Sequence, residues 1–250
     1  MRRLFRLAGR SIWLLAVLAI AAVDAFAVAA GRGFKPSLQT RTLWLHRNSK
    51  RVLRVFASGV EREGPLPKSG LLVCNHLSYL DILLLASLTP AVFVSKHEIR
   101  HWPLVGWFAR MAGTIFVRRE RRSDVARTGE EIRSVMRQGQ LVVLFPEGTS
   151  SNGKQVLPFK SSLLEPATGT DHYLFAGHIA YGILEGSVEN DVCYWGDMTF
   201  FPHAVILLTK PRVTASVHFS RVQAADASRK DLSRRLHEEV LRLKQVSLTE

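Results

Sequence analysis

The sequence has few cysteines and few acidic residues for its length, and both shortages limit what the chain can be. Its 250 residues include only two cysteines, Cys74 and Cys193, so neither a disulfide framework nor a cysteine-based metal site is available. The 21 acidic residues are outnumbered by 34 lysines and arginines, which gives a net charge of +13. This excess favours a polyanionic partner, which would be nucleic acid, an anionic membrane surface or a phosphorylated substrate.

Internal repeats and low-complexity tracts are also absent from the sequence. The composition is 47% hydrophobic and 22% charged, so it can supply a core and does not suit a largely disordered chain. A chain of this length suits one sizeable domain with an appendage.

Residues 11–31 form a long apolar run in which Asp24 is the only charge. A helix of this length, with a rise of about 1.5 Å per residue, could cross or deeply enter a hydrocarbon layer about 30 Å thick. We expect a retained membrane anchor, which favours lipid over nucleic acid as the partner of the basic charge. The alternatives are a cleavable signal that begins with Arg2 and Arg3, a tilted or half-inserted helix, and a buried core helix.

Basic residues flank this run on both sides, so the positive-inside rule gives no orientation and a hairpin or re-entrant pair fits better. Residues 36–57 can supply the second helix, with an apolar side and a side that carries arginine and lysine. Such a helix either lies in the interface of an anionic bilayer or docks on the domain with an ordinary solvated face. We therefore expect a membrane anchor with an amphipathic helix at residues 1–58 and the main domain at residues 59–250.

A turn-rich link over residues 61–69 leads into the main domain, where short apolar strands alternate with helical stretches. The pattern predicts strands near 70–74, 91–95, 113–118, 140–145, 174–181 and 213–219, and helices near 79–88, 103–111, 123–138 and 228–245. This alternation indicates an α/β fold with a mixed, mostly parallel sheet flanked by helices.

The stretch Asn75–Asp81 follows the first of these strands and contains a candidate catalytic pair. His76 can accept a proton near neutral pH, and Asp81 can fix its tautomer and stabilise the imidazolium. Positions i and i+5 are about 140° apart around a helix, so His76 must precede the helix if the two side chains are to meet. The alternative is a structural histidine, with Ser78-x-x-Asp81 acting only as a helix cap.

Two later stretches carry polar groups at strand ends. One predicted strand ends in Arg118 and Arg119, and arginine suits bidentate contact with phosphate. Another runs into Pro146–Ser150, where a glycine and small hydroxyl residues allow the backbone to approach a ligand closely. In that turn Glu147 can pair with an arginine or accept a hydrogen bond from a substrate hydroxyl. Taken singly, the two stretches are better interpreted as a surface arginine pair and an acidic turn.

In this order and spacing, the three stretches resemble the motifs of the glycerolipid acyltransferase family, which includes the 1-acylglycerol-3-phosphate acyltransferases. The resemblance covers roughly residues 52–222. Matching residues are Asn75, His76 and Asp81 in the first motif, Gly113, Ile115, Phe116, Val117 and Arg119 in the second, Phe145 to Thr149 in the third, and Lys96, Glu98, Pro103 and Gly106 between them.

The resemblance implies that His76 and Asp81 deprotonate the free hydroxyl of a lysolipid, which attacks the thioester of acyl-coenzyme A or acyl carrier protein. It also implies phosphatidic acid as product, association with anionic lipids, and a location at the cytoplasmic face of the inner membrane. Thioester carbonyls are already activated, so we expect neither a metal nor an organic cofactor. The residues expected to bind substrate are Asn75, Lys96, Gly113, Arg119, Glu147, Gly148, Thr149 and Lys160.

Departures from the family pattern concern the acceptor. Many members have arginine after the third motif, where this chain has Ser150, and Lys160 is a candidate replacement for that cation. Residues 159–164 and 194–198 resemble the branch that contains lyso-ornithine lipid acyltransferases, which is the alternative acceptor class. A non-catalytic lipid-binding module and a hydrolase that uses water as acceptor are the alternatives of other classes.

Overall fold

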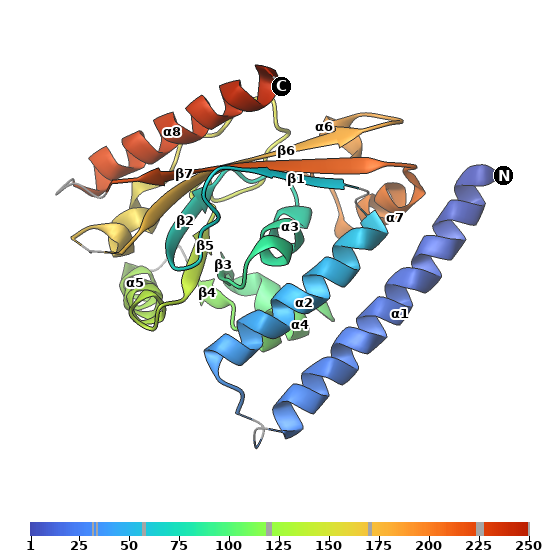
Figure 1. Ribbon diagram of the computed structural model, residues 1–250, viewed down its shortest axis with the longest axis horizontal. Coiled ribbons are helices and arrows are strands. Elements are labelled where there is room, and N and C mark those ends of the chain that lie inside the picture. Colours follow the sequence, from blue (N-terminus) through green and yellow to red (C-terminus); the bar gives the residue numbers. More distant parts are fainter. Residues whose placement is uncertain are drawn as a thin grey trace.

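The computed structural model describes residues 1–31, 33, 35–56, 59–118, 122–169, 172–223 and 228–249 (Figure 1). Within these ranges seven strands form one sheet in the order β1-β7-β6-β2-β5-β3-β4. The strands are β1 (Gly59–Glu63), β2 (Gly70–Cys74), β3 (Val92–Lys96), β4 (Ile115–Val117), β5 (Leu141–Leu144), β6 (Leu174–Ile183) and β7 (Val213–Val222). The helices are α1 (Arg2–Ala30), α2 (Leu38–Phe56), α3 (Leu80–Leu88), η1 (His97–His101), α4 (Val105–Ala112), α5 (Arg122–Arg137), η2 (Ser161–Ala167), α6 (Val188–Asp191), α7 (Phe200–Thr209) and α8 (Arg229–Thr249).

The sheet is mixed and mostly parallel, as the sequence predicts. Only β6 and β7 pair antiparallel, and every other neighbouring pair in the described sheet is parallel. The six predicted strands are all present. The expectation of a turn-rich link from residue 61 is wrong at its start, because β1 occupies Gly59–Glu63 and pairs with β7. This edge strand has four exposed residues and lacks the apolar alternation by which a half-buried strand is recognised.

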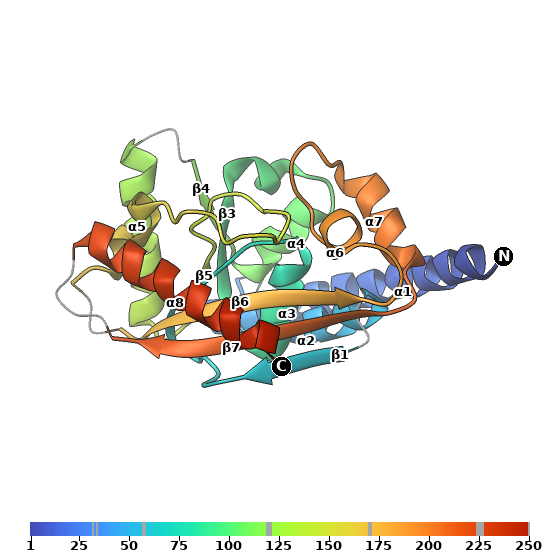
Figure 2. The ribbon, with the colours of Figure 1, turned by 90° about the horizontal axis from the view of Figure 1, so that it is seen from above.

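Helices cover both faces of the sheet, so the central strands are apolar on both sides. Figure 1 shows α8 on one side of the strands and α1, α2 and α3 on the other. Successive residues of β2 alternate between the two cores: Leu72 and Cys74 pack in the core beneath α3, and Leu71 and Val73 pack in the core beneath α5 and α8. Figure 2, turned by 90°, shows α8 crossing over β6 and β7. Cys74 is a free, buried cysteine and packs there as a small apolar residue.

The first two helices lie against each other, which agrees with the expected hairpin. The indole nitrogen of Trp44 donates to the carbonyl of Ala21 at 3.1 Å, and Arg51 pairs with Asp24 at 2.5 Å. The single charge of the apolar run is thus neutralised by the neighbouring helix. The inner face of α2 docks on α3, while Arg47 and other basic residues remain exposed on its outer face.

Helix α1 remains against the domain along most of its length. Arg6 donates to the carbonyl of Thr209, the last residue of α7, at 2.7 Å, and Arg10 donates to that of Pro211, just beyond this helix, at 3.2 Å. Helix α1 is long and apolar enough to cross a membrane, with a mean hydropathy of 2.4 over an 18-residue window. Its fully buried apolar residues are Val17, Ala21 and Ala25, and most of its large apolar side chains are exposed, so the buried core helix is excluded.

Helix α7 has no counterpart among the predicted helices. Its sequence, Phe200–Thr209, is apolar almost all round and therefore carries no periodic signal. Pro202 in its first turn is compatible with a helix start. The exposed side chains of Phe201, Val205 and Ile206 lie on its outer face.

Candidate active site

The carboxyl end of β2 delivers the first motif, and the side chain of Asn75 continues the strand's hydrogen-bond ladder. The pairing of β2 with β6 ends at Cys74 and Gly177. Beyond that point the Asn75 amide donates to the carbonyl of Ile179 at 2.9 Å and accepts from its N–H at 2.7 Å. With 3% of its surface exposed, Asn75 fixes the loop that carries His76. Its expected contact with substrate stays a prediction.

His76 and Asp81 meet as the sequence predicts. The Nδ1 atom of His76 lies 2.7 Å from Oδ2 of Asp81, whose side chain is fully buried. Helix α3 begins at Leu80, so His76 lies in the loop before it. The same Asp81 oxygen accepts from the main-chain N–H groups of Leu77 at 2.7 Å and Ser78 at 3.0 Å.

The interpretation of Ser78 as the N-terminal cap of the helix is wrong. Residue Tyr79 occupies the N-cap position without a side-chain cap, and the buried Ser78 hydroxyl has no hydrogen-bond partner in the described chain. The carboxylate of Asp81, in the first turn, takes over the free N–H groups that precede the helix. One carboxylate therefore caps the helix and holds the histidine.

The hydrogen bond to Asp81 decides which nitrogen of His76 is the base. A carboxylate accepts from Nδ1–H, which leaves the lone pair of neutral imidazole on Nε2. Among the described residues no hydrogen bond reaches Nε2, and the side chain is 21% exposed. The ring stacks on Phe145, with centroids 4.2 Å apart and planes 16° apart. His76 is thus held through Nδ1 and through one face of its ring, and its side chain remains partly exposed.

A tyrosine that the sequence does not single out completes this arrangement. The hydroxyl of Tyr181, on β6, donates to Oδ1 of Asp81 at 2.7 Å, and the residue is 9% exposed. No spacing in the sequence joins positions 81 and 181, because their contact depends on the register of β6 with β2.

Glu147 is buried and bonded to the main chain. Its Oε1 accepts from the N–H of His76 at 2.9 Å, and its Oε2 accepts from the N–H of Leu157 at 3.3 Å. Burial raises the pKa of Glu147 to about 7, although these two hydrogen bonds act in the opposite direction. The carboxylate therefore joins the loop after β5 to the loop after β2. The two roles expected from the sequence, pairing with an arginine and accepting from a substrate hydroxyl, do not include this contact.

The remaining residues of the third motif wrap around the His76 loop. Gly148 has a φ of 77°, a conformation that favours glycine, and Thr149 is exposed. The main-chain N–H of Ser151 donates to the carbonyl of His76 at 2.9 Å. The hydroxyl of Ser150, at the position where many family members carry arginine, donates to the carbonyl of Tyr194.

Lys160 and Lys96 are both exposed. The main-chain N–H of Lys160 donates to the carbonyl of Pro146 at 2.9 Å, which brings the lysine beside the third motif. Lys96 ends β3 and pairs in register with Val117 of β4. Strand β5 lies between β3 and β2, and adjacent strands are about 4.8 Å apart, so Lys96 is on the order of 10 Å from the end of β2.

The second motif begins at Gly113 and ends at Arg119, with Arg118 just before it. Gly113 ends α4 with a φ of 84°, and a Cβ there would lie 2.7 Å from Cδ1 of Leu38, so its local part is conformational. Arg118 lies 2.7 Å from Nε2 of His97. Arg119, the expected phosphate contact, lies outside the described residues, and its part stays a prediction.

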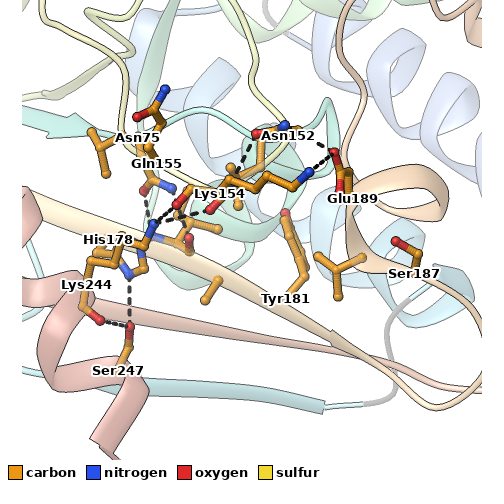
Figure 3. A pocket seen from close by; sticks show the side chains of 16 residues that line it. Asn75, Asn152, Lys154, Gln155, His178, Tyr181, Ser187, Glu189, Lys244 and Ser247 are labelled. Atoms are coloured by element: carbon orange, nitrogen blue, oxygen red, sulfur yellow. Dashed lines mark hydrogen bonds and ion pairs between the residues drawn. The ribbon is translucent and has the colours of Figure 1, made fainter.

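A cavity of about 350 Å³ borders the catalytic loop on the side of α8 (Figure 3). Figure 3 shows Lys154 extended toward Glu189, 2.9 Å away, and Lys244 and Ser247 near His178 at another end. Burial, followed by the charges of Lys244 and His218, lowers the pKa of His178 to about 4. Asn75 and Tyr181, which both support the first motif, also line this cavity.

Comparison with protein families agrees with the motifs. Residues 46–176, more than half of the chain, match the family model described as Acyltransferase. The chain belongs to this acyltransferase family. It is therefore an enzyme that transfers acyl groups, and the non-catalytic lipid-binding module is excluded.

Two curated relatives extend this acyltransferase match over most of the chain. It is 33% identical to the lyso-ornithine lipid O-acyltransferase of Rhizobium meliloti strain 1021, over 80% of this chain and 74% of the relative. The corresponding protein of Brucella abortus strain 2308 is 32% identical, over 79% and 80%. The 1-acyl-sn-glycerol-3-phosphate acyltransferase of Neisseria meningitidis serogroup B is 35% identical, over 52% of each chain.

A solved structure supports the fold. The 1-acyl-sn-glycerophosphate (LPA) acyltransferase PlsC from Thermotoga maritima matches 98% of this acyltransferase and 98% of its own chain, with a TM-score of 0.64. The sequence identity is 20%, so the likeness concerns the fold alone.

Proposed function

We propose that this enzyme is a membrane-associated lysolipid O-acyltransferase in which His76 is the general base. The observation that carries the proposal is a partly exposed histidine whose Nδ1 is bonded to a buried carboxylate at 2.7 Å, and whose Nε2 has no hydrogen bond among the described residues. Nε2 takes the proton from the lysolipid hydroxyl, and the hydroxyl oxygen forms a bond to the thioester carbonyl carbon. The carbon–sulfur bond then breaks, and the imidazolium returns the proton to the leaving thiolate.

Coenzyme A or acyl carrier protein carries the acyl group in this proposal. A thioester carbonyl is already activated, so the reaction needs neither a metal ion nor an organic cofactor. Asp81 stabilises the imidazolium that forms when His76 takes the proton. Lys96 and Arg118, at the ends of β3 and β4, place positive charge at the edge of the sheet that carries His76, where an acidic group of the acceptor would meet it.

For the acceptor we propose lyso-ornithine lipid, with 1-acylglycerol-3-phosphate, which the motifs alone favour, as the second candidate. Support comes from relatives named for lyso-ornithine lipid, which align over 74% and 80% of their length. A physical feature points the same way: Ser150 replaces a cation and bonds to the carbonyl of Tyr194. That tyrosine begins the 194–198 stretch that resembles the lyso-ornithine branch.

For the membrane contact we propose that α1 lies along the interface of the cytoplasmic leaflet. Contacts with α2 and α7 hold α1 to the domain from Arg6 to Asp24, so a perpendicular crossing would carry the domain into the bilayer. Its outer face is apolar and continues onto α7, with exposed Phe5, Ile12, Leu15, Val23 and Phe201. The net charge of +13 suits an anionic lipid surface, and the acyl donors are cytoplasmic.

The test combines purified enzyme, an acyl donor and a mixture of lyso-ornithine lipid and 1-acylglycerol-3-phosphate in vesicles, with products identified by mass. We expect the diacyl ornithine lipid as the main product. The His76→Ala variant should show background activity, and equal activity would refute the assignment of the base. Phosphatidic acid as the main product would select the second acceptor, and fatty acid formed without any lysolipid would indicate hydrolysis.

A further inference from the structure

Both oxygens of the buried Asp81 carboxylate are bonded, and they are bonded by different parts of the fold. Oδ2 accepts from Nδ1 of His76 and from the main chain of Leu77 and Ser78. Oδ1 accepts from the hydroxyl of Tyr181 at 2.7 Å, its one hydrogen bond among the described residues. Tyr181 is therefore the donor that reaches the far oxygen of the carboxylate, opposite the side that binds His76.

The architecture of β6 brings this hydroxyl to the site. Strand β6 runs on to Ile183, whereas its pairing with β2 stops at Gly177. Beyond Gly177, on the side that faces β2, the main chain of Ile179 binds the side chain of Asn75. Side chains two residues apart on a strand share a face, so Tyr181 packs with Ile179 in the core beneath α3.

We propose that Tyr181 is a positioning residue of the acyl transfer. Its hydroxyl holds the Asp81 carboxylate that orients His76, and it also sets how strongly this carboxylate stabilises the imidazolium. The inference rests on the proposed function of His76 and Asp81 and assigns a third member to their pair. A hydroxyl that donates to a carboxylate draws charge from it, so Tyr181 weakens the attraction between Asp81 and a protonated His76.

The hydroxyl of Tyr181 stays protonated throughout the working pH range, so it remains a donor to Asp81. Burial, reinforced by the charge of Asp81 and the hydrogen bond to it, raises the pKa of Tyr181 well above its ordinary value. Burial and Asp81 likewise raise the pKa of Cys74 on β2 and of Cys193 after α6, so both thiols remain neutral. Glu147 titrates near pH 7, and it acts on the main chain of His76.

The first experiment compares the wild-type enzyme with Tyr181→Phe, which keeps the ring and removes the donor. Tyr173→Phe is the matched control, because Tyr173 lies just before the same strand with its side chain 49% exposed. We expect Tyr181→Phe to lower kcat on the order of tenfold, the lower end of what loss of a supporting hydrogen bond costs at an active site, with KM unchanged. The acid limb of the kcat/KM profile should move to higher pH, because Asp81 then stabilises the imidazolium more strongly.

Two further variants separate positioning from support of the fold. In an Asp81→Asn background, the factor lost on Tyr181→Phe should shrink toward one, because the carboxylate that Tyr181 positions is gone. Fluorotyrosine at position 181 keeps the shape and donates more strongly, so the acid limb should move to lower pH. This second variant also replaces Tyr181→Phe if the latter does not fold.

The outcomes distinguish this inference from the function on which it depends. A pH profile and kcat unchanged in Tyr181→Phe, with His76→Ala inactive, would overturn the part of Tyr181 alone. Equal losses in the wild-type and Asp81→Asn backgrounds, with no shift of the acid limb, would also overturn it and indicate a structural part. Full activity of His76→Ala would refute the proposed base itself.

Discussion

Oε1 of Glu147 lies 2.9 Å from the main-chain nitrogen of His76, so a buried carboxylate holds the backbone on which the base is carried. Its other oxygen accepts from Leu157. A carboxyl group whose pKa is raised to about 7 in the folded chain binds protons that the unfolded chain has already lost.

The free energy of unfolding should therefore fall as the pH rises from 4.5 to 7 and level off above that range. Because the folded pKa lies above the unfolded one, each step of deprotonation in this window costs stability, up to about 3 kcal/mol from the shift of Glu147. Denaturant unfolding at several pH values measures the slope. Glu147→Gln cannot titrate and should flatten it, whereas Glu131→Gln, on the exposed surface of α5, is the matched control.

Replacing Asp81 by asparagine should impair both catalysis and the start of α3. The amide keeps one acceptor for the N–H groups of Leu77 and Ser78 but loses the charge that stabilises a protonated His76. We expect kcat/KM to fall by at least about 100-fold, since the same change in a serine-protease triad costs more than that. Steady-state kinetics measure the loss, and a variant within threefold of wild type would contradict the mechanism.

Neutralising one partner of the Asp24–Arg51 pair should destabilise the helical hairpin more than neutralising both. Arg51→Gln leaves a carboxylate unpaired between α1 and α2, whereas the double variant with Asp24→Asn leaves none. The side chains are 40% and 32% exposed, so we expect a coupling energy of about 1 kcal/mol or less in water and more in lipid. Thermal unfolding of the four proteins in detergent gives the coupling, and additive effects would show that the pair contributes nothing.

Charges introduced on the outer face of α1 and α7 should weaken membrane binding. Ile12→Glu, Val23→Glu and Phe201→Glu each remove a side chain that is at least 68% exposed, and each should cost about 2 kcal/mol of partitioning. Cosedimentation with anionic vesicles measures the change. Val60→Glu, which adds the same charge on β1 at the sheet edge, should bind as the wild type does, and equal losses would show that the effect is only electrostatic.

The sequence predicts what local spacing determines, and it fails where distant segments meet. The strands, the position of His76 before its helix and the contact with Asp81 follow from periodicity and from a separation of five residues. The sequence does not predict helix α7, because a segment that is apolar throughout has no hydrophobic periodicity. The parts of Glu147 and Tyr181 depend on the register of β5 and β6 with β2, which local patterns do not contain.

Ser78 shows a further limit of sequence patterns. The pattern Ser78-x-x-Asp81 predicts that the side chain of Ser78 caps the helix. In the structure the side chain of Asp81 does so instead. A carboxylate that already faces His76 can take the free N–H groups before the helix, so the serine hydroxyl is left without a partner in the described chain.

The contacts that fix the catalytic loop also bear on when the enzyme becomes active during folding. They join residues 71, 100 and 104 positions apart: His76 with Glu147, Asp81 with Tyr181, and Asn75 with Ile179. Contacts of such separation form late, because the intervening chain must first be ordered. A nascent chain that ends before β6 has the whole His76–Asp81 motif but not the strand that anchors it. The enzyme should therefore become active only when the sheet is complete. A chain truncated before β6 should have no acyltransferase activity.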